Sequence, residues 1–182
     1  MDRFTVIDDY FPQWMIDSVS NYLKTYPVTY DNTPNDTFDK ARFLGNTLLM
    51  QDRWNVIGYE RYWFIDYFNM CIQHDILKEL NITHCARCLL NGQFPNCGMN
   101  GLNHDDSDTD DYQSVIYMAH GNSGDTVILN EDNTENRISF KEGRIVTFNS
   151  RIIHRGESPI EGYRISLGFV YPLFDPDNCK HY

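Results

Sequence analysis

The chain has 182 residues, of which 41% are hydrophobic and 23% are charged. These values are typical of a globular domain and exclude a disordered or collagen-like chain. The 26 Asp and Glu residues outnumber the 15 Lys and Arg residues, which gives a formal net charge of -11. Because so negative a surface repels phosphate backbones, we expect no nucleic-acid partner.

The sequence lacks the usual signals for membrane insertion or secretion. No apolar run approaches the roughly 20 residues of a membrane-spanning helix. The opening MDRFTVIDDYF lacks the basic and apolar regions of a signal peptide. We therefore expect no membrane partner and a cytoplasmic location, in the host cytoplasm if the protein is viral. Five cysteines, an odd number, favour free thiols in that compartment.

Cys85 and Cys88 have the spacing of a zinc or redox pair. The segment HCARCLL around them predicts a strand, in which residues three apart face opposite sides. The sequence also has no second CxxC motif. We therefore interpret both cysteines as structural.

The first 83 residues predict a mainly helical support. A short strand, FTVID, precedes an amphipathic helix over 13–24, in which apolar residues recur at helical spacing. Residues 26–42 contain two prolines and many Asn, Asp and Thr residues, which predicts a loop. The aromatic-rich stretch 56–80 predicts a second helix that packs under a sheet.

From His84 onward the sequence predicts short strands separated by turn residues. The eight predicted strands cover 84–90, 98–104, 113–119, 125–130, 136–140, 144–148, 151–155 and 162–171. Eight antiparallel strands at this spacing indicate a sandwich or barrel. The expected fold class is α+β, with a helical support over 1–83, a jelly-roll core over 84–171 and a tail over 172–182, all in one domain, 1–182.

The segment Asn103-His104-Asp105-Asp106 carries an imidazole and a carboxylate on one face of a predicted strand, because positions 104 and 106 are two apart. Another histidine, His154, ends a strand predicted fifty positions later. Two neutral imidazoles and one hard carboxylate form the facial triad that binds Fe(II) and leaves sites open for a co-substrate and oxygen. By itself this spacing is a weak signal.

The last predicted strand, GYRISLGFVYP, has two unlike faces. One face carries Arg164, Ser166 and Gly168, and the other carries only aromatic or large aliphatic side chains. An arginine on the inner face of a barrel is costly unless it meets an anion, and a guanidinium binds a carboxylate through two hydrogen bonds. Arg164 therefore predicts an anion site near the metal site, with a structural salt bridge as the alternative.

Together these motifs resemble the double-stranded β-helix core of the 2-oxoglutarate- and iron-dependent dioxygenases, and they are most similar to the prolyl 4-hydroxylase-like branch. The opening FTVIDDYFPQWMIDSVSNYL resembles the strand and helix that begin that branch. The stretch GRIVTF at 143–148 resembles the strand that leads to its second histidine. The resemblance is weak over 1–80 and strong over 84–171.

The resemblance implies a role for each motif residue. The ligands of Fe(II) would be His104, Asp106 and His154. The distal carboxylate of 2-oxoglutarate, the co-substrate, would be bound by Arg164, Ser166 and Tyr117. Ascorbate is a candidate accessory cofactor. The implied enzyme is an oxidoreductase that hydroxylates its substrate and releases succinate and CO2, because Asp106 supplies the carboxylate that related halogenases lack.

The substrate is less well defined. The branch implies a prolyl residue of a peptide or protein, but Ser123-Gly124-Asp125 and Tyr117-Met-Ala-His120 depart from its motifs beside the substrate opening. A hydroxylase of a free amino acid or small metabolite is therefore an alternative, and a non-enzymatic cupin-like binding module is a second. A nucleic-acid demethylase is disfavoured, because Val170 stands where such enzymes carry a second arginine.

Two segments are candidates for substrate contact. The acidic run from Asp105 to Asp111 lacks the glycine and glutamate of a calcium loop, so we interpret it as a solvated rim that favours basic peptides. Residues 38–54 are a candidate lid or substrate wall. Arg42 and Arg53, within it, are candidate substrate-binding residues.

Overall fold

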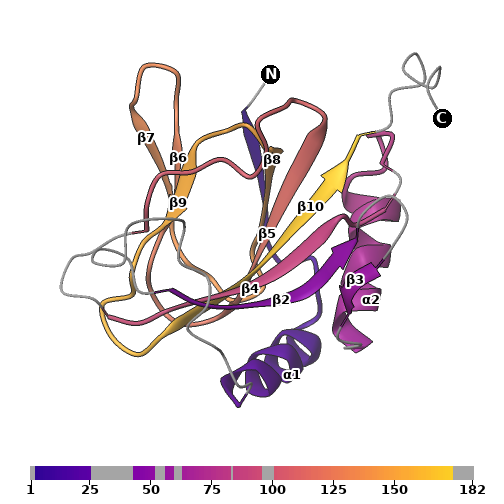
Figure 1. Ribbon diagram of the computed structural model, residues 1–182. Coiled ribbons are helices and arrows are strands. Elements are labelled where there is room, and N and C mark those ends of the chain that lie inside the picture. The colour runs from indigo at the N-terminus through magenta and orange to yellow at the C-terminus, as the bar shows by residue number, and fades with distance from the viewer. Residues whose placement is uncertain are drawn as a thin grey trace, which may run out of the picture.

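The computed structural model describes residues 3–25, 43–51, 56–59, 63–82, 84–95 and 101–173. In these residues ten strands form two antiparallel sheets. The large sheet has the order β1-β8-β5-β10-β4-β2-β3, and the small sheet has the order β7-β6-β9. Figure 1 shows the two sheets facing each other, with the helices on the outer side of the large sheet. None of the helices in these ranges is long and apolar enough to cross a membrane.

The start of the chain matches the prediction. Strand β1 (Phe4–Ile7) pairs with β8 at the edge of the large sheet, and helix α1 (Gln13–Lys24) follows it. Pro12 stands just before the helix with φ -65, an angle that its ring fixes and that suits a helix start. The buried face of α1, which includes Met15, Val19 and Leu23, packs against the large sheet.

Residues 43–51 and 56–59 form strands, which corrects the prediction of a mainly helical support over 1–83. They hold strand β2 (Phe43–Gln51) and strand β3 (Val56–Tyr59), which extend the large sheet beyond β4. The helix predicted over 56–80 begins only at Trp63, as α2 (Trp63–Cys71), and continues as a π-helix (Ile72–Ile76). Apolar periodicity alone does not separate a buried strand from a buried helix, which is the reason for this error.

Seven of the eight predicted core strands are present, each shifted by a few residues. They are β4 (Arg87–Gln93), β5 (Tyr112–His120), β6 (Thr126–Leu129), β7 (Glu135–Ile138), β8 (Ile145–Asn149), β9 (His154–Gly156) and β10 (Arg164–Pro172). Of the strand predicted over 98–104, only 101–104 is described, and there His104 forms an isolated bridge with His154. The described residues from His84 onward therefore hold seven of the eight predicted strands, and β1, β2 and β3 from the first 83 residues add to the large sheet.

The large sheet separates two apolar clusters. Its outer face packs on α1 and α2 and buries alternate side chains of β10, among them Ile165, Leu167, Phe169 and Tyr171. This is the alternation predicted for the last strand. A smaller cluster that includes Met118, Ile128 and Phe148 fills part of the space between the sheets. Each large side chain so buried contributes roughly 1.5–3 kcal/mol to folding.

The two cysteines of the CxxC motif lie in the helix-side cluster. They do not face opposite sides as predicted, because Cys85 precedes β4 and only Cys88 lies in it. Burial raises the pKa of Cys85 to about 12 and raises that of Cys88 as well, so both thiols are protonated at neutral pH. Both side chains are buried in an apolar cluster, which supports the structural interpretation.

Candidate active site

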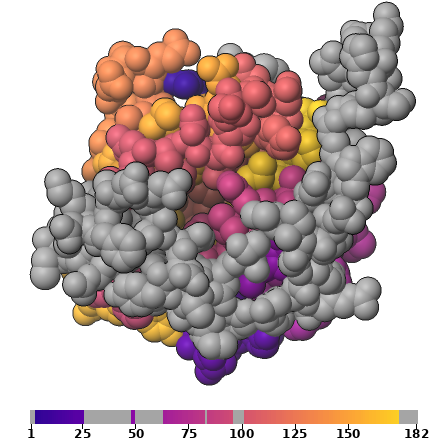
Figure 2. Space-filling model, in the orientation of Figure 1, coloured from indigo at the N-terminus to yellow at the C-terminus, as the bar shows by residue number. Residues whose placement is uncertain are grey.

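A cavity of about 430 Å³ opens between the two sheets. Figure 2 shows this face of the molecule, which is hollowed between them. The polar part of the lining comes from four strands and from the segment 103–106. It consists of Arg87, Asn91, Asn103, His104, Asp105, Asp106, Thr126, His154, Arg164 and Ser166.

The fold brings His104, Asp106 and His154 together, as the sequence predicts. One potential ligand atom of each lies within 4.8 Å of the others. The two histidines hold each other in register: the His104 amide donates to the His154 carbonyl at 3.0 Å, and the His154 amide donates to the His104 carbonyl at 2.8 Å. Their rings lie 4.4 Å apart between centroids. Backbone contact between His104 and His154 of β9 therefore positions both imidazoles.

Both imidazoles present Nε2 to the site. Nδ1 of His104 donates to the carbonyl of Leu102 at 2.9 Å, and Nδ1 of His154 donates to the carbonyl of Ile152 at 2.9 Å. A carbonyl only accepts, so the proton lies on Nδ1 and the lone pair on Nε2. Burial lowers the pKa of His154 to about 4, which keeps this ring neutral at neutral pH, as a metal ligand must be.

The carboxylate of Asp106 is held by three other parts of the chain. Its Oδ1 accepts from Nη2 of Arg87 at 2.7 Å, and its Oδ2 accepts from Oγ of Ser114 at 2.7 Å. Its backbone amide donates to the carbonyl of Ser150 at 2.8 Å. Oδ2 lies 3.7 Å from Nε2 of His154. Two neutral imidazoles and one carboxylate, converging on one point, are the donor set of a non-haem Fe(II) site, and these residues fit that metal.

Arg164 lines the same cavity and is 3% exposed. Its Nη1 donates to Oε1 of Gln93 at 2.8 Å, and its Nη2 donates to Oγ1 of Thr126 at 2.9 Å. Ser166 is a weaker partner, with its Oγ 3.5 Å from Nη1. In the part of the chain that the structure describes, Nε has no partner and no ion pair joins Arg164 to a carboxylate.

Burial lowers the pKa of Arg164 to about 10, which leaves the guanidinium charged at neutral pH. Asp125 and Glu157 attract this charge but form no ion pair with it. A buried charge whose direct hydrogen-bond partners are all neutral is costly, and a carboxylate entering the cavity would offset that cost. The predicted alternative of a structural salt bridge is therefore not what the described residues show. The geometry of Arg164 favours an anion site beside the triad.

The structure corrects the role expected for Tyr117 in binding 2-oxoglutarate, because its side chain does not face the cavity. Its ring lies in the helix-side cluster, 4.6 Å from the ring of Phe68 and 5.8 Å from that of Phe11 between centroids. Its hydroxyl is buried without a hydrogen-bond partner among the described residues. Side chains alternate along a strand, so in β5 Ile116 lines the cavity and the next residue, Tyr117, faces the helices.

Sequence reasoning missed the contribution of β4. Arg87, Asn91 and Gln93 lie at alternate positions of RCLLNGQ, and they contact Asp106, the cavity and Arg164 respectively. This period of two is visible in the sequence and would have identified them. Thr126 carries no comparable signal. Arg42 and Arg53 lie outside the described residues.

The acidic run is only partly at the rim of the cavity. Asp105 lines the cavity and is exposed. Asp110 does not line the cavity, and its carboxylate pairs with Arg151 at an N–O distance of 3.0 Å. Of the proposed lid over 38–54, residues 43–51 form β2 and pair with β4, so this part is a strand of the large sheet. The rest of that segment lies outside the described residues.

No family model matches the sequence, and neither does any curated protein. Solved structures do match. A prolyl-4-hydroxylase from Pseudomonas putida aligns with a TM-score of 0.68 and 12% identity over 93% of this chain and 91% of that one. A prolyl hydroxylase from Trichoplax adhaerens, in complex with a peptide of hypoxia-inducible factor, aligns with a TM-score of 0.69 and 17% identity over 94% of this chain and 84% of that one.

The chain has the fold of the 2-oxoglutarate- and Fe(II)-dependent oxygenases. A further neighbour is the alpha-ketoglutarate-dependent non-haem carbocyclase of nogalamycin biosynthesis, with a TM-score of 0.69 and 11% identity over 93% of this chain and 79% of that one. These likenesses confirm, at the level of the fold, the resemblance predicted from the sequence motifs.

Proposed function

We propose that this protein is a 2-oxoglutarate- and Fe(II)-dependent dioxygenase that hydroxylates its substrate. The observation that carries the proposal is the position of Arg164, a buried cation that forms no ion pair with a carboxylate of the described residues, in the cavity of the His104-Asp106-His154 triad. A metal ligand set and a separate carboxylate site in one cavity are what binding of 2-oxoglutarate beside Fe(II) requires.

Each residue then has a defined task. His104, Asp106 and His154 would hold Fe(II), and the Nδ1 hydrogen bonds leave both Nε2 lone pairs available to it. Arg164 binds the distal carboxylate of 2-oxoglutarate, with the hydroxyl of Ser166 beside it. Fe(II) loaded with 2-oxoglutarate supplies the activation of oxygen for hydroxylation, with succinate and CO2 as by-products. Ascorbate serves as a reductant that keeps the metal as Fe(II).

As substrate we propose a prolyl residue of a peptide or protein. Two structural neighbours are prolyl hydroxylases, and the one from Trichoplax adhaerens was solved with a peptide. A small-molecule substrate is the second candidate, because the carbocyclase of nogalamycin biosynthesis has the same fold. The exposed carboxylate of Asp105 at the cavity favours a basic substrate in either case.

The test is a succinate assay on the purified chain with Fe(II), 2-oxoglutarate and ascorbate. Prolyl peptides, with and without flanking lysines, are compared with free amino acids, and the product is examined for a mass gain of one oxygen atom. We expect succinate from the unaltered protein, little from R164M, and unchanged amounts from R151M, whose arginine pairs with Asp110 at the surface. A chain that binds no 2-oxoglutarate and forms no succinate with any substrate is a binding module instead.

A further inference from the structure

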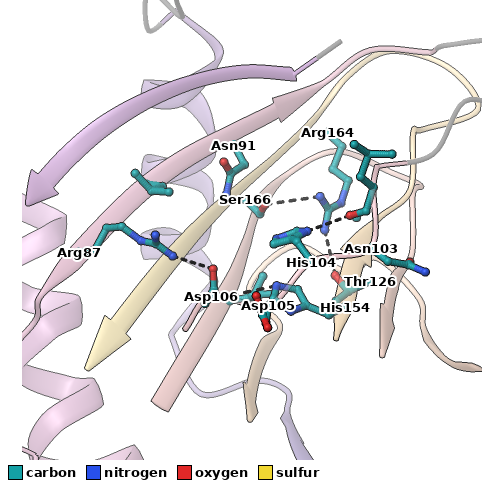
Figure 3. Close-up of a pocket in the computed structure, with 14 residues that line it drawn as sticks. Arg87, Asn91, Asn103, His104, Asp105, Asp106, Thr126, His154, Arg164 and Ser166 are labelled. Atoms are coloured by element: carbon teal, nitrogen blue, oxygen red, sulfur yellow. Dashed lines mark hydrogen bonds and ion pairs between the residues drawn. The ribbon is translucent and has the colours of Figure 1, made fainter. Parts of the chain in front are cut away.

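Arg87 lies in the cavity but has no place in the function proposed above. It begins β4, and Figure 3 shows its guanidinium directed at Asp106. The Nη2–Oδ1 distance is 2.7 Å, and the side chains are 29% and 18% exposed, so this ion pair is partly shielded from water. A charged hydrogen bond of this length is among the stronger side-chain contacts.

The two oxygens of Asp106 have different surroundings. Oδ1 is bound by Arg87. Oδ2 accepts one hydrogen bond from the buried hydroxyl of Ser114 and lies 3.7 Å from Nε2 of His154. Each carboxylate oxygen has two lone pairs, so Oδ2 keeps one for a metal on the side of the imidazoles. Oδ1, in contrast, is occupied by a cation that repels a metal ion.

Ser114 is itself held in place by Ser150. Its Oγ lies 2.8 Å from Oγ of Ser150, and the carbonyl of Ser150 accepts the backbone amide of Asp106 at 2.8 Å. Both serines are buried. One carboxylate is thus held on one side by a rigid pair of serines from β5 and the end of β8, and on the other side by Arg87 from β4.

We infer that Arg87 is a positioning residue that holds Oδ1 of Asp106, so that this carboxylate binds the metal through Oδ2 alone. The inference rests on the proposed function, since it concerns the same metal site. Arg87 therefore fixes which oxygen of Asp106 faces the two imidazoles.

A purely electrostatic role for Arg87 makes the opposite prediction. A cation close to a divalent metal weakens its binding, so removal of the charge would strengthen it. If Arg87 positions Asp106, removal instead frees the carboxylate to rotate and weakens metal binding. The sign of the change separates the two roles.

The experiment measures binding of Co(II), a stable substitute for Fe(II), to the unaltered protein and to R87M, R87K and R87Q, by calorimetry. We expect the Kd of R87M to rise roughly 10- to 100-fold, the typical cost of losing a group that orients a metal ligand. R87K and R87Q, which keep a donor, should recover part of the affinity. The control is R151M, which removes an ion pair with Asp110 from the surface and should bind Co(II) like the unaltered protein.

A second readout is the binding of 2-oxoglutarate to the Co(II)-loaded proteins, which should weaken in R87M and not in R151M. Far-UV circular dichroism and the melting temperature establish that each variant is folded, and R87Q replaces R87M if the latter is not. Equal or tighter Co(II) binding by R87M overturns the inference and leaves the proposed function standing. A failure of the unaltered protein to bind Co(II) overturns the proposed function and the inference with it.

Discussion

His104 and His154 exchange two backbone hydrogen bonds, with N–O distances of 3.0 and 2.8 Å, although they lie fifty positions apart in the sequence. This single bridge holds the two histidines side by side. The backbone contact with β9 therefore positions both of these candidate metal ligands.

His104 is exposed, so its replacement should affect metal binding much more than folding. H104A should lose measurable Co(II) binding in calorimetry, because one of three ligands is gone, while its free energy of unfolding changes by less than about 1 kcal/mol. H74A is a matched control, since His74 is an exposed histidine of the π-helix, remote in sequence from the cavity. Undiminished Co(II) binding by H104A would remove His104 from the ligand set.

Tyr117 should not take part in co-substrate binding. Its hydroxyl is buried without a partner among the described residues, so Y117F removes an unsatisfied polar group and should raise the free energy of unfolding by about 1 kcal/mol. The KM for 2-oxoglutarate in the succinate assay should stay the same. A clear rise in that KM would show that the hydroxyl reaches the co-substrate and would restore the role that the family resemblance implies.

Gly156 leaves the space that the Arg164 guanidinium occupies. A Cβ at this position would lie 2.7 Å from Nη1 of Arg164 and 2.9 Å from Oε1 of Gln93. G156A should therefore displace the guanidinium and raise the KM for 2-oxoglutarate, with Co(II) affinity retained. G168A, whose Cβ would meet only Asn91 at 3.5 Å, is the matched control in β10. Equal KM values in the two variants would contradict this placement of Arg164.

The pair of Asp8 with Arg144 joins the start of the chain to the turn before β8. Two hydrogen bonds of 2.8 Å from Nε and Nη2 lower the pKa of Asp8. A carboxyl with a lowered folded-state pKa stabilises the protein above its unfolded value, about 3.9, and loses that contribution as the pH falls through the folded value. Because Asp8 is 34% exposed, D8N should cost only about 0.5–1 kcal/mol at neutral pH.

Urea unfolding of the unaltered protein and of D8N over an acid pH series checks this pH dependence. The difference in unfolding free energy between the two proteins should shrink as the pH falls below about 4, because the Asp8 carboxyl is then protonated in the unaltered protein too. D132N is a useful comparison, since the pKa of Asp132 is also lowered, but by hydrogen bonds within its own turn. A difference independent of pH would show that the ion pair contributes nothing to stability.

The sequence was sufficient for those parts of the site that combine a distinctive residue with a clean period. His104 and Asp106 are two apart, and Arg164 stands in a strand that alternates without exception, so both faces could be assigned correctly. Tyr117 was assigned to the wrong face because a displacement of one residue along β5 moves a side chain to the other side of the sheet. A match to a family motif does not reveal such a displacement.

The parts that could not be predicted depend on contacts between distant segments. Strands β2 and β3 have no alternation that distinguishes them from helix. The place of β2 follows from pairing with β4, far along the chain, and the place of β3 follows from pairing with β2. Arg164 has two hydrogen-bond partners, Gln93 of β4 and Thr126 of β6. Both reach Arg164 only because β4 and β6 lie on opposite sides of the cavity. Contacts of this kind depend on the order of the strands in the two sheets, and a single sequence indicates that order only indirectly.

Among the described residues no carboxylate forms an ion pair with Arg164, although Asp125 and Glu157 attract its charge, and this arrangement has a thermodynamic consequence. A dicarboxylate that neutralises this cation binds the folded chain and not the unfolded one, so it shifts the folding equilibrium in proportion to the logarithm of its concentration. The melting temperature of the protein should therefore respond to 2-oxoglutarate even where no substrate is known and no turnover takes place. Under the proposed function, the supply of a central metabolite would also govern how long this protein persists in its folded form.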